Sequence, residues 1–318
     1  MPTSQDPMIC RRRLRDTLRR LRESAGLTQR DVATELEWSL SKVIRIESGS
    51  VGVTITDLRA LIHKYGISDR TRMDELLALA RAARERTQWS SYRTITTPTM
   101  LAFLGFESSA ATIRNFEPIR IPGLLQTEDY ARALLDHLFQ DNTVEERVRM
   151  RMDRQRILDT GTNGPRLNFV IDECALYRPI GGITAMRRQL RHLLAITDHP
   201  QVVLRIAPLS AGLNSIVNVG YTIFEFHDPE DGVVLTLEGP EYNIIRENLD
   251  VSAPLNYLED FWRLEQIAHI GQAADLLRRA IAYFDREPDP NFASGSQSTL
   301  HPLPTRTATS HPRRPPPG

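Results

Sequence analysis

The sequence predicts a protein of two domains, an all-α domain of five helices at residues 11–86 and an α+β domain at residues 101–286. Three observations support this division. Apolar residues before residue 86 recur at spacings of three and four, which is the period of one helix face. Short apolar runs beyond residue 101 are interspersed with helical patterns, as in a sheet flanked by helices. The chain of 318 residues is also long enough for about two domains.

The composition is that of an ordinary globular protein, with 41% hydrophobic and 25% charged residues. No stretch approaches the ~20 consecutive apolar residues of a membrane span, and no secretory signal follows the N-terminal arginines. We therefore expect a cytoplasmic protein without membrane contact. The two cysteines, Cys10 and Cys174, are too few for a structural zinc site and are not expected to form a disulfide in a reducing compartment.

The net charge of zero hides a difference between the two domains. Residues 1–86 carry 17 Lys and Arg against 12 Asp and Glu, a balance of +5, whereas residues 87–286 carry 20 against 26, a balance of −6. A basic domain beside an acidic one is typical of a protein whose N-terminal part meets phosphates. Many soluble domains have a charge of this size, so the charge favours a nucleic-acid partner without establishing one.

The five helices of the first domain are delimited by residues that begin and end helices. Ser, Thr and Asp side chains before a helix accept hydrogen bonds from its free amides. Glycine after a helix adopts the left-handed conformation that ends it. The expected caps are Thr28, Ser39, Thr56 and Asp69, and the expected stops are Gly26, Gly49 and Gly66.

The rest of the chain predicts a linker, a mixed sheet and a tail. Residues 87–100 hold Ser, Thr and Pro without a helical period, and the Pro- and Arg-rich residues 287–318 are expected to be disordered. The segment HDPEDG between two apolar runs predicts a hairpin. The expected strands are 115–121, 167–172, 202–207, 221–226 and 233–238. One helix is expected to begin at Thr127, and four others are expected to cover 143–159, 184–197, 253–269 and 271–285.

Residues 27–49 (LTQRDVATELEWSLSKVIRIESG) predict two short helices joined by a tight turn. In the second helix Ser41, Lys42 and Arg45 share one outward face, because positions three and four apart are neighbours on a helix. A helix of this size fits the DNA major groove, where Arg45 can form a bidentate pair with guanine. The N-terminus of the first helix, with Thr28, can meet a phosphate. Helical hairpins with exposed basic residues are common, so the pattern alone leaves other roles open.

The two-helix segment 27–49 resembles the XRE/Cro-type helix-turn-helix, which it matches at Thr28-Gln29, Ala33, Ser39, Ile46, Glu47 and Gly49. The resemblance implies a five-helix, lambda-repressor-like domain with a recognition helix over 39–47 and an ion pair between Arg22 and Glu47. Two positions depart from the family: Glu37 stands where the turn usually has glycine, and Leu40 is apolar where many relatives are polar. The DNA-binding residues that pattern and resemblance together predict are Thr28, Gln29, Arg30, Ser39, Leu40, Ser41, Lys42 and Arg45.

The second domain resembles that of WhiJ-like actinobacterial regulators. The matching segments are FEPIRIPGLLQTEDYARALL (116–135), IDECALYRP (171–179), VVLRIAPLSAG (202–212) and VVLTLEG (233–239), and with the first domain the resemblance covers residues 11–286. It implies a regulator whose second domain has no assigned function. It also implies that a very small partner protein is encoded nearby, in an arrangement similar to an antitoxin with its toxin.

The second domain contains no recognisable catalytic motif, so we expect no enzyme, cofactor or metal. The five histidines of this domain lack metal-ligand spacing, and Asp172-Glu173-Cys174 is expected to form a cap or turn. An aromatic group at helical spacing is expected in the core. Three arginines are expected on a solvated helix face, with anion binding as the alternative. The residues of these four groups are His137, His192, His199, His227 and His269; Asp172, Glu173 and Cys174; Tyr257, Phe261 and Trp262; Arg187, Arg188 and Arg191.

The function that this sequence favours is a sequence-specific transcription regulator that binds double-stranded DNA. A homodimer is expected, because two heads on a palindrome compensate for the small contact area of one. The second domain is expected to sense a ligand or a partner protein. The alternatives are an antitoxin-like protein that holds a small partner and regulates itself by DNA binding, and an enzyme with a fused DNA-binding domain.

Overall fold

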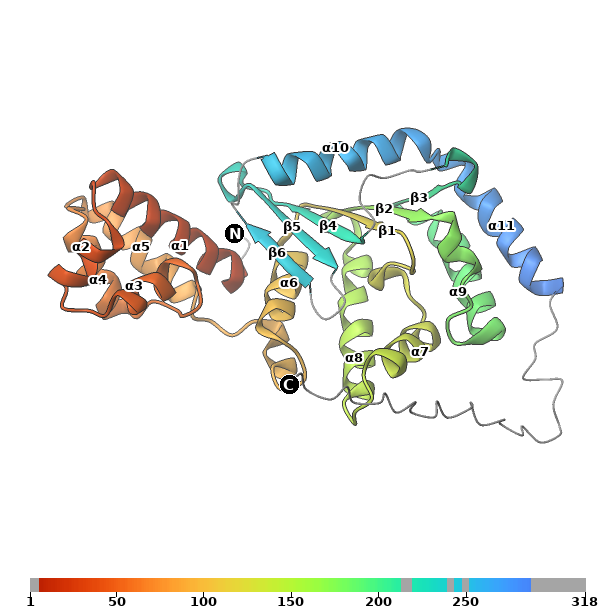
Figure 1. Cartoon of the computed structure of the whole chain (residues 1–318), viewed down its shortest axis with the longest axis horizontal. Helices are drawn as coiled ribbons and strands as arrows, with labels where there is room; N and C mark the ends of the chain where they lie inside the picture. The colour runs from red at the N-terminus through yellow and green to blue at the C-terminus, as the bar shows by residue number, and fades with distance from the viewer. Residues whose placement is uncertain (1–5, 213–218, 239–242, 248–251, 287–318) are drawn as a thin grey trace, which may run out of the picture.

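The computed structural model describes residues 6–212, 219–238, 243–247 and 252–286. It has a helical part, here called the head (α1–α5), beside a six-stranded sheet with helices α6–α11, here called the sheet domain (Figure 1). The predicted order of an all-α domain followed by an α+β domain is confirmed. The tail that we predicted to be disordered, residues 287–318, lies outside the described residues.

The head consists of α1 (Pro7–Ser24), α2 (Gln29–Glu35), α3 (Leu40–Glu47), α4 (Ile55–Lys64) and α5 (Arg70–Ala82). Thr28, Ser39 and Asp69 cap their helices as predicted, and the stop glycines have φ near +70°. One predicted cap was wrong. Thr54, not Thr56, is extended and accepts a hydrogen bond from the amide of Asp57 at 3.0 Å. The helices enclose one core built on Leu18, Val32, Val43, Leu58, Leu61 and Leu76.

The sheet has the strand order β3-β2-β1-β4-β5-β6 in the described residues. Strands β1–β3 are parallel and the others pair antiparallel, and the predicted hairpin joins β4 to β5. Its strands are β1 (Thr112–Glu117), β2 (Arg166–Asp172), β3 (Val202–Ala207), β4 (Tyr221–Glu225), β5 (Val233–Glu238) and β6 (Asn243–Glu247).

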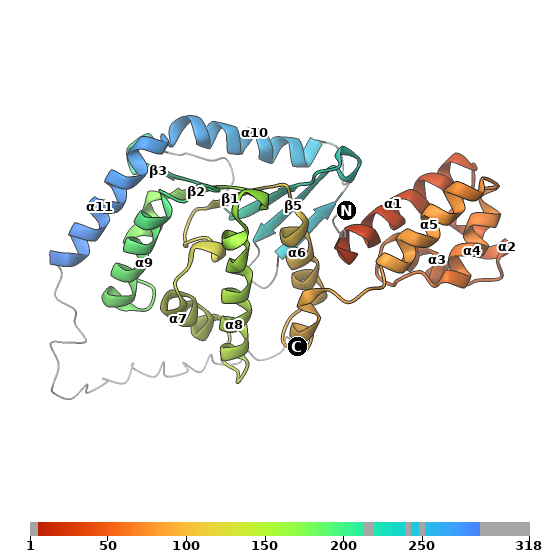
Figure 2. The same cartoon turned by 180° about the vertical axis from the view of Figure 1, so that it is seen from behind.

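Helices cover both faces of this sheet. Figures 1 and 2 show α10 along one face and α6–α9 on the other, while α11 packs against α9 and β3. The main core lies on the α6–α9 face and a smaller core lies under α10. The helices are α6 (Pro98–Ser109), α7 (Glu128–Leu138), α8 (Val144–Arg154), α9 (Gly182–Ile196), α10 (Ser252–Ile267) and α11 (Ile270–Arg286).

The segment that we expected to be a linker, residues 87–100, is more structured than its composition suggests. It contains a short 3₁₀ helix, Gln88–Tyr92, whose Trp89 is buried in the main core, and its end forms the first turn of α6. Helix α6 was not predicted, because it is apolar around most of its circumference and so lacks an amphipathic period. Strand β6 was also missed. Strand β1 begins three residues before the start of the predicted strand 115–121, and it ends four residues before the end of that strand.

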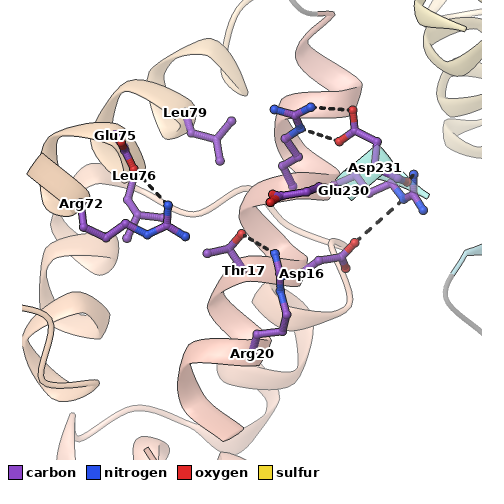
Figure 3. A pocket seen from close by; sticks show the side chains of 11 residues that line it. Asp16, Thr17, Arg20, Arg72, Glu75, Leu76, Leu79, Glu230 and Asp231 are labelled. Atoms are coloured by element: carbon purple, nitrogen blue, oxygen red, sulfur yellow. Dashed lines mark hydrogen bonds and ion pairs between the residues drawn. The ribbon is translucent and has the colours of Figure 1, made fainter. Parts of the chain in front are cut away.

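The first turns of α1 pack in the sheet domain, and this packing joins the head to the sheet domain. Ile9 is part of the main core, and Met8 packs so closely on α6 that a Cβ at Gly105 would lie 2.4 Å from its side chain. Figure 3 shows Asp231, from the β4–β5 turn, beside α1. The carboxylate of Asp231 accepts a hydrogen bond from Arg13 Nη2 at 2.7 Å, and Arg12 donates to its carbonyl oxygen. A cleft of about 230 Å³ lies next to these contacts.

In the part of the chain that the structure describes, no helix combines the length and the apolar character that crossing a membrane requires.

Candidate nucleic-acid interface

The turn between α2 and α3 fixes the angle of the two helices. Glu37 has φ +55°, and it is the one non-glycine residue with positive φ among those described. This is the position where the sequence departs from the usual glycine, and a side chain there is strained because its Cβ crowds the backbone. The next amide, that of Trp38, donates to the carbonyl oxygen of Ala33 at 2.8 Å and closes the turn.

Helix α3 presents one face to solvent and buries the other. Val43, Ile46 and Glu47 are buried against the rest of the head. The outward face combines apolar and polar side chains: Leu40 is 36% exposed, Ile44 is 43% exposed, and Ser41 and Arg45 are exposed as well.

Arg45 is the exposed cation of this face. Its guanidinium makes no hydrogen bond or ion pair with any residue that the structure describes, whereas most arginines of α1 have carboxylate partners. A free guanidinium on an exposed helix is available to a base edge or a phosphate.

Lys42 differs from this pattern. Its Nζ lies 2.7 Å from a carboxylate oxygen of Asp57 in α4 and 3.7 Å from the centre of the Trp38 ring. Both contacts direct the ammonium group along the head surface, so a base or phosphate would have to compete with Asp57 for it. Sequence spacing gave no sign of the Asp57 partner, because it comes from a different helix.

The predicted phosphate contacts at the start of α2 are held in a capping box. The hydroxyl of Thr28 accepts from the amide of Asp31 at 3.2 Å, and the Asp31 carboxylate accepts from the amide of Thr28 at 2.8 Å. Hydrogen bonds from the hydroxyl and amide of Thr28 lower the pKa of Asp31. Gln29 is directed inward and donates to Glu47 at 2.8 Å, whereas Arg30 is exposed. Of these residues Arg30 is therefore the one most accessible to a phosphate.

A buried ion pair joins α1 to α3. Arg22 Nε lies 2.7 Å from Glu47 Oε1 and Arg22 Nη2 lies 3.0 Å from Glu47 Oε2, a bidentate arrangement in which both residues are buried. Arg22 Nη1 also donates to the carbonyl oxygen of Leu27 at 2.8 Å. The hydrogen bonds with Glu47 raise the pKa of Arg22. These are the two residues for which the resemblance implied such a pair.

The other sequence candidates have structural roles in the sheet domain. Asp172 caps a 3₁₀ helix by accepting from the amide of Cys174 at 2.9 Å. Arg188 and Arg191 of α9 are exposed as expected and pair with Asp129 of α7 and Asp285 of α11, whereas Arg187 is partly buried against the end of α11. Phe261 is buried as predicted, whereas the prediction for Trp262 was wrong, since it is 47% exposed on α10. Among the described residues, no three His, Cys, Asp or Glu side chains are grouped as metal ligands.

This geometry defines a class of protein. A short turn joins two helices, the second of which exposes polar and cationic side chains, and the helix-turn-helix domain family matches residues 13–76. The domain indicates a DNA-binding regulator. A second family, a domain of unknown function (DUF5753), matches residues 100–286, more than half of the chain. The chain belongs to the DUF5753 family. No curated protein and no solved structure matches the chain significantly.

Proposed function

We propose that this protein is a sequence-specific transcription regulator that recognises double-stranded DNA with α3. The observation that supports the proposal most strongly is Arg45, an exposed arginine without a described partner in the last turn of the second helix of a helix-turn-helix. In the major groove, Arg45 donates two hydrogen bonds to a guanine edge and Ser41 contacts a neighbouring base. Leu40 and Ile44 then lie against thymine methyl groups.

Contacts to the DNA backbone position this helix. Arg30 binds a phosphate, and Thr28, Gln29 and Ser39 lie near the backbone through the helix ends that they cap or support. Lys42 joins them when a phosphate replaces Asp57. Two heads of a homodimer recognise the halves of a palindrome, since one head of this size buries little surface on DNA.

The sheet domain gives the regulator its input. Its resemblance to WhiJ-like actinobacterial regulators supports a domain that senses a ligand or a small partner protein. An antitoxin-like protein that holds such a partner is the second candidate, and the exposed Trp262 on α10 favours it, because large exposed aromatic side chains are enriched at protein interfaces. Co-purification of a small protein that the Trp262→Ala variant loses would support this candidate. That the chain is not an enzyme stays a prediction.

The DNA-binding proposal is tested by selecting bound fragments from sheared DNA of the source genome with the native protein and with Arg45→Ala. The native protein is expected to enrich a short palindrome. Arg45→Ala is expected to weaken binding to it by ~1–3 kcal/mol, roughly 5- to 150-fold, the value of one bidentate base contact. The matched control is Arg72→Ala, which removes an exposed arginine of α5 whose partner is Glu75.

Three outcomes are distinguishable. Loss of the palindrome in Arg45→Ala alone supports the assignment of α3. An equal loss in Arg72→Ala would indicate a general effect of charge and would contradict the assignment. If the native protein enriches no sequence at moderate salt, the DNA-binding proposal fails and the partner-binding candidate takes its place.

A further inference from the structure

A cavity of about 740 Å³ lies on the face of the sheet opposite α10, between β1, α6, α7 and α8. Its volume is in the range typical of small-molecule sites. Ile113, Asn115 and Glu117 line it from alternate positions of β1, and Thr222 lines it from the paired position on β4. The remaining wall combines apolar side chains with several arginines and carboxylates.

Two ion pairs in the cavity wall, one buried and one partly exposed, are neutral. Arg154 makes a bidentate pair with Glu107, with distances of 2.9 and 2.8 Å, and both are buried. Arg120 pairs with Glu238. These four charges are balanced within the protein, so they leave no net charge for a ligand.

A third arginine in the wall has no such balance. Arg151 Nη1 donates to the amide oxygen of Gln126 at 2.6 Å, and no carboxylate of the described chain forms an ion pair with its guanidinium. Burial, reinforced by the charge of Arg154, lowers the pKa of Arg151 to about 10, so it still carries its charge at neutral pH. A charge in a cavity wall without an ion-pair partner is costly, and perturbed groups of this kind are frequent at functional sites.

Glu117 does not supply the missing negative charge. It is buried, and its carboxyl group lies beside that of Glu238, where a Cβ at Gly220 would be 3.1 Å from one and 3.4 Å from the other. Burial, together with the charge of Glu238, raises the pKa of Glu117 well above its usual range. Arg147, which also lines the cavity, lies 4.0 Å from Asp141, so Arg151 is the wall arginine for which the described residues offer no ion-pair partner.

Asn115 provides a second group without a described partner, the hydrogen-bond acceptor Oδ1 of its side chain. Its side chain is 7% exposed, and its Nδ2 donates to the carbonyl oxygen of Tyr221 at 3.2 Å and to the hydroxyl of Thr222 at 2.9 Å. Its Oδ1 accepts no hydrogen bond from any described residue. Buried polar atoms nearly always have a partner, so this acceptor points to a donor on a bound molecule.

We propose that the cavity binds a small organic acid with an apolar body and a hydrogen-bond donor. The acid group pairs with Arg151, the donor meets Asn115 Oδ1, and the apolar body packs between Phe103 of α6 and Phe169 of β2, which also line the cavity. This inference deepens the proposed function, on which it rests for its purpose, by assigning the ligand class that the sheet domain senses.

The location of the cavity connects such a ligand to the head. Helix α6 forms part of the wall, and its other side contacts α1 where Met8 meets Gly105. Residues 94–97, which lead from the head to α6, also line the cavity. A ligand therefore contacts two of the segments that hold the head in place, while the contact of Arg12 and Arg13 with the β4–β5 turn lies outside the cavity.

The test is isothermal titration calorimetry on the full chain with two probes of nearly equal shape, naphthalene-1-acetate and the neutral naphthalene-1-acetamide. The native protein is expected to bind one acetate, at least tenfold more tightly than the amide. Arg151→Met should lose this preference, and Arg151→Lys should retain part of it. The control Arg156→Met removes an arginine just after α8 that is 79% exposed and outside the cavity, so it should behave like the native protein.

Several results would overturn the proposal. Equal affinity for the two probes, binding of neither below about 1 mM, or an unchanged preference in Arg151→Met would each do so. Thermal unfolding gives a further readout, because removal of an unbalanced buried charge should not lower the unfolding temperature of the ligand-free protein. A lower unfolding temperature for Arg151→Met would make Arg151 a structural residue. The assay contains no DNA, so its failure is distinct from failure of the DNA-binding proposal.

Discussion

Replacement of Arg22 by alanine should destabilise the head far more than replacement of a neighbouring arginine on the same helix. Arg22→Ala removes two hydrogen bonds to Glu47 and one to the carbonyl oxygen of Leu27. The Glu47 carboxylate then stays buried with the amide of Gln29 as its remaining hydrogen-bond donor in the described chain. The change therefore leaves a buried charge without its counterion.

The expected cost follows from that uncompensated charge. Removing one partner of a buried ion pair typically costs about 3–5 kcal/mol, out of a total stability of about 5–15 kcal/mol for a domain. At about 1.4 kcal/mol for each factor of ten, the opening equilibrium of α2 and α3 should rise by roughly 100- to 5,000-fold. The double variant Arg22→Met/Glu47→Leu should lose much less, because it removes both charges together.

Hydrogen–deuterium exchange of peptides from α2 and α3, followed by mass spectrometry, measures this opening directly. The control is Arg19→Ala, since Arg19 pairs with Glu23 one turn along the same helix and both side chains are at least half exposed. Exchange in the control should equal that of the native protein, because exposed pairs contribute little. Similar exchange in Arg22→Ala and Arg19→Ala would refute the argument that burial determines the effect.

Two further predictions concern strain and protonation. Glu37→Gly should raise the free energy of unfolding of the head by about 0.5–1 kcal/mol in urea titrations, because glycine adopts the positive φ of this position without strain. Gly26→Ala should lower the free energy of unfolding by a similar amount, because it places a Cβ at a positive φ although there is space for the atom. Changes of the opposite sign would contradict the argument from backbone strain. Since the pKa of Glu117 is raised, the folded protein keeps a proton that the unfolded chain releases above about pH 4.5, and stability falls as the pH rises. Glu117→Gln should therefore raise the melting temperature more at about pH 8 than at about pH 5, and an equal effect at both would show that Glu117 is ionised in the fold.

The parts of the fold that the sequence predicts well are those with a strong local signal. Three of the four helix caps are correct, because a Ser, Thr or Asp before an apolar period acts within one turn. Strands β3 and β5 are correct to the residue, since each is a short, mainly apolar run (VVLRIA and VVLTLE). The wrong cap has a simple reason: Thr54 and Thr56 are both suitable, and only the extended backbone at Thr54 distinguishes them.

The missed elements lack such a signal. Helix α6 packs against α1, β6 and the 3₁₀ helix at 88–92, and its mainly apolar sequence shows no amphipathic period. Strand β6 has the sequence NIIRE, in which two central apolar residues are too few to indicate a strand.

The candidate sites differ in the same way. The outward face of α3 could be predicted, because side chains three and four residues apart must share a face. The inward direction of Gln29 and the contact of Lys42 with Asp57 could not, since each depends on a partner from another helix. The cavity is the extreme case: Asn115, Arg151 and Glu238 come from three distant segments, which meet only through the strand order of the sheet and the packing of α8 on it.

Helix α1 explains how a domain with its own core is held to the rest of the chain. Its first turns place Ile9 in the main core of the sheet domain, whereas Leu14 and Leu18 lie in the core of the head. A continuous helix does not bend without a cost in hydrogen bonds, so a shift of α6 against Met8 changes the direction of the whole head. If the proposed ligand moves α6, the two recognition helices of the proposed dimer would change their spacing, on which affinity for a palindrome depends. The position of α1 across two cores would thus give the proposed ligand a mechanical route to the proposed DNA contacts of α3.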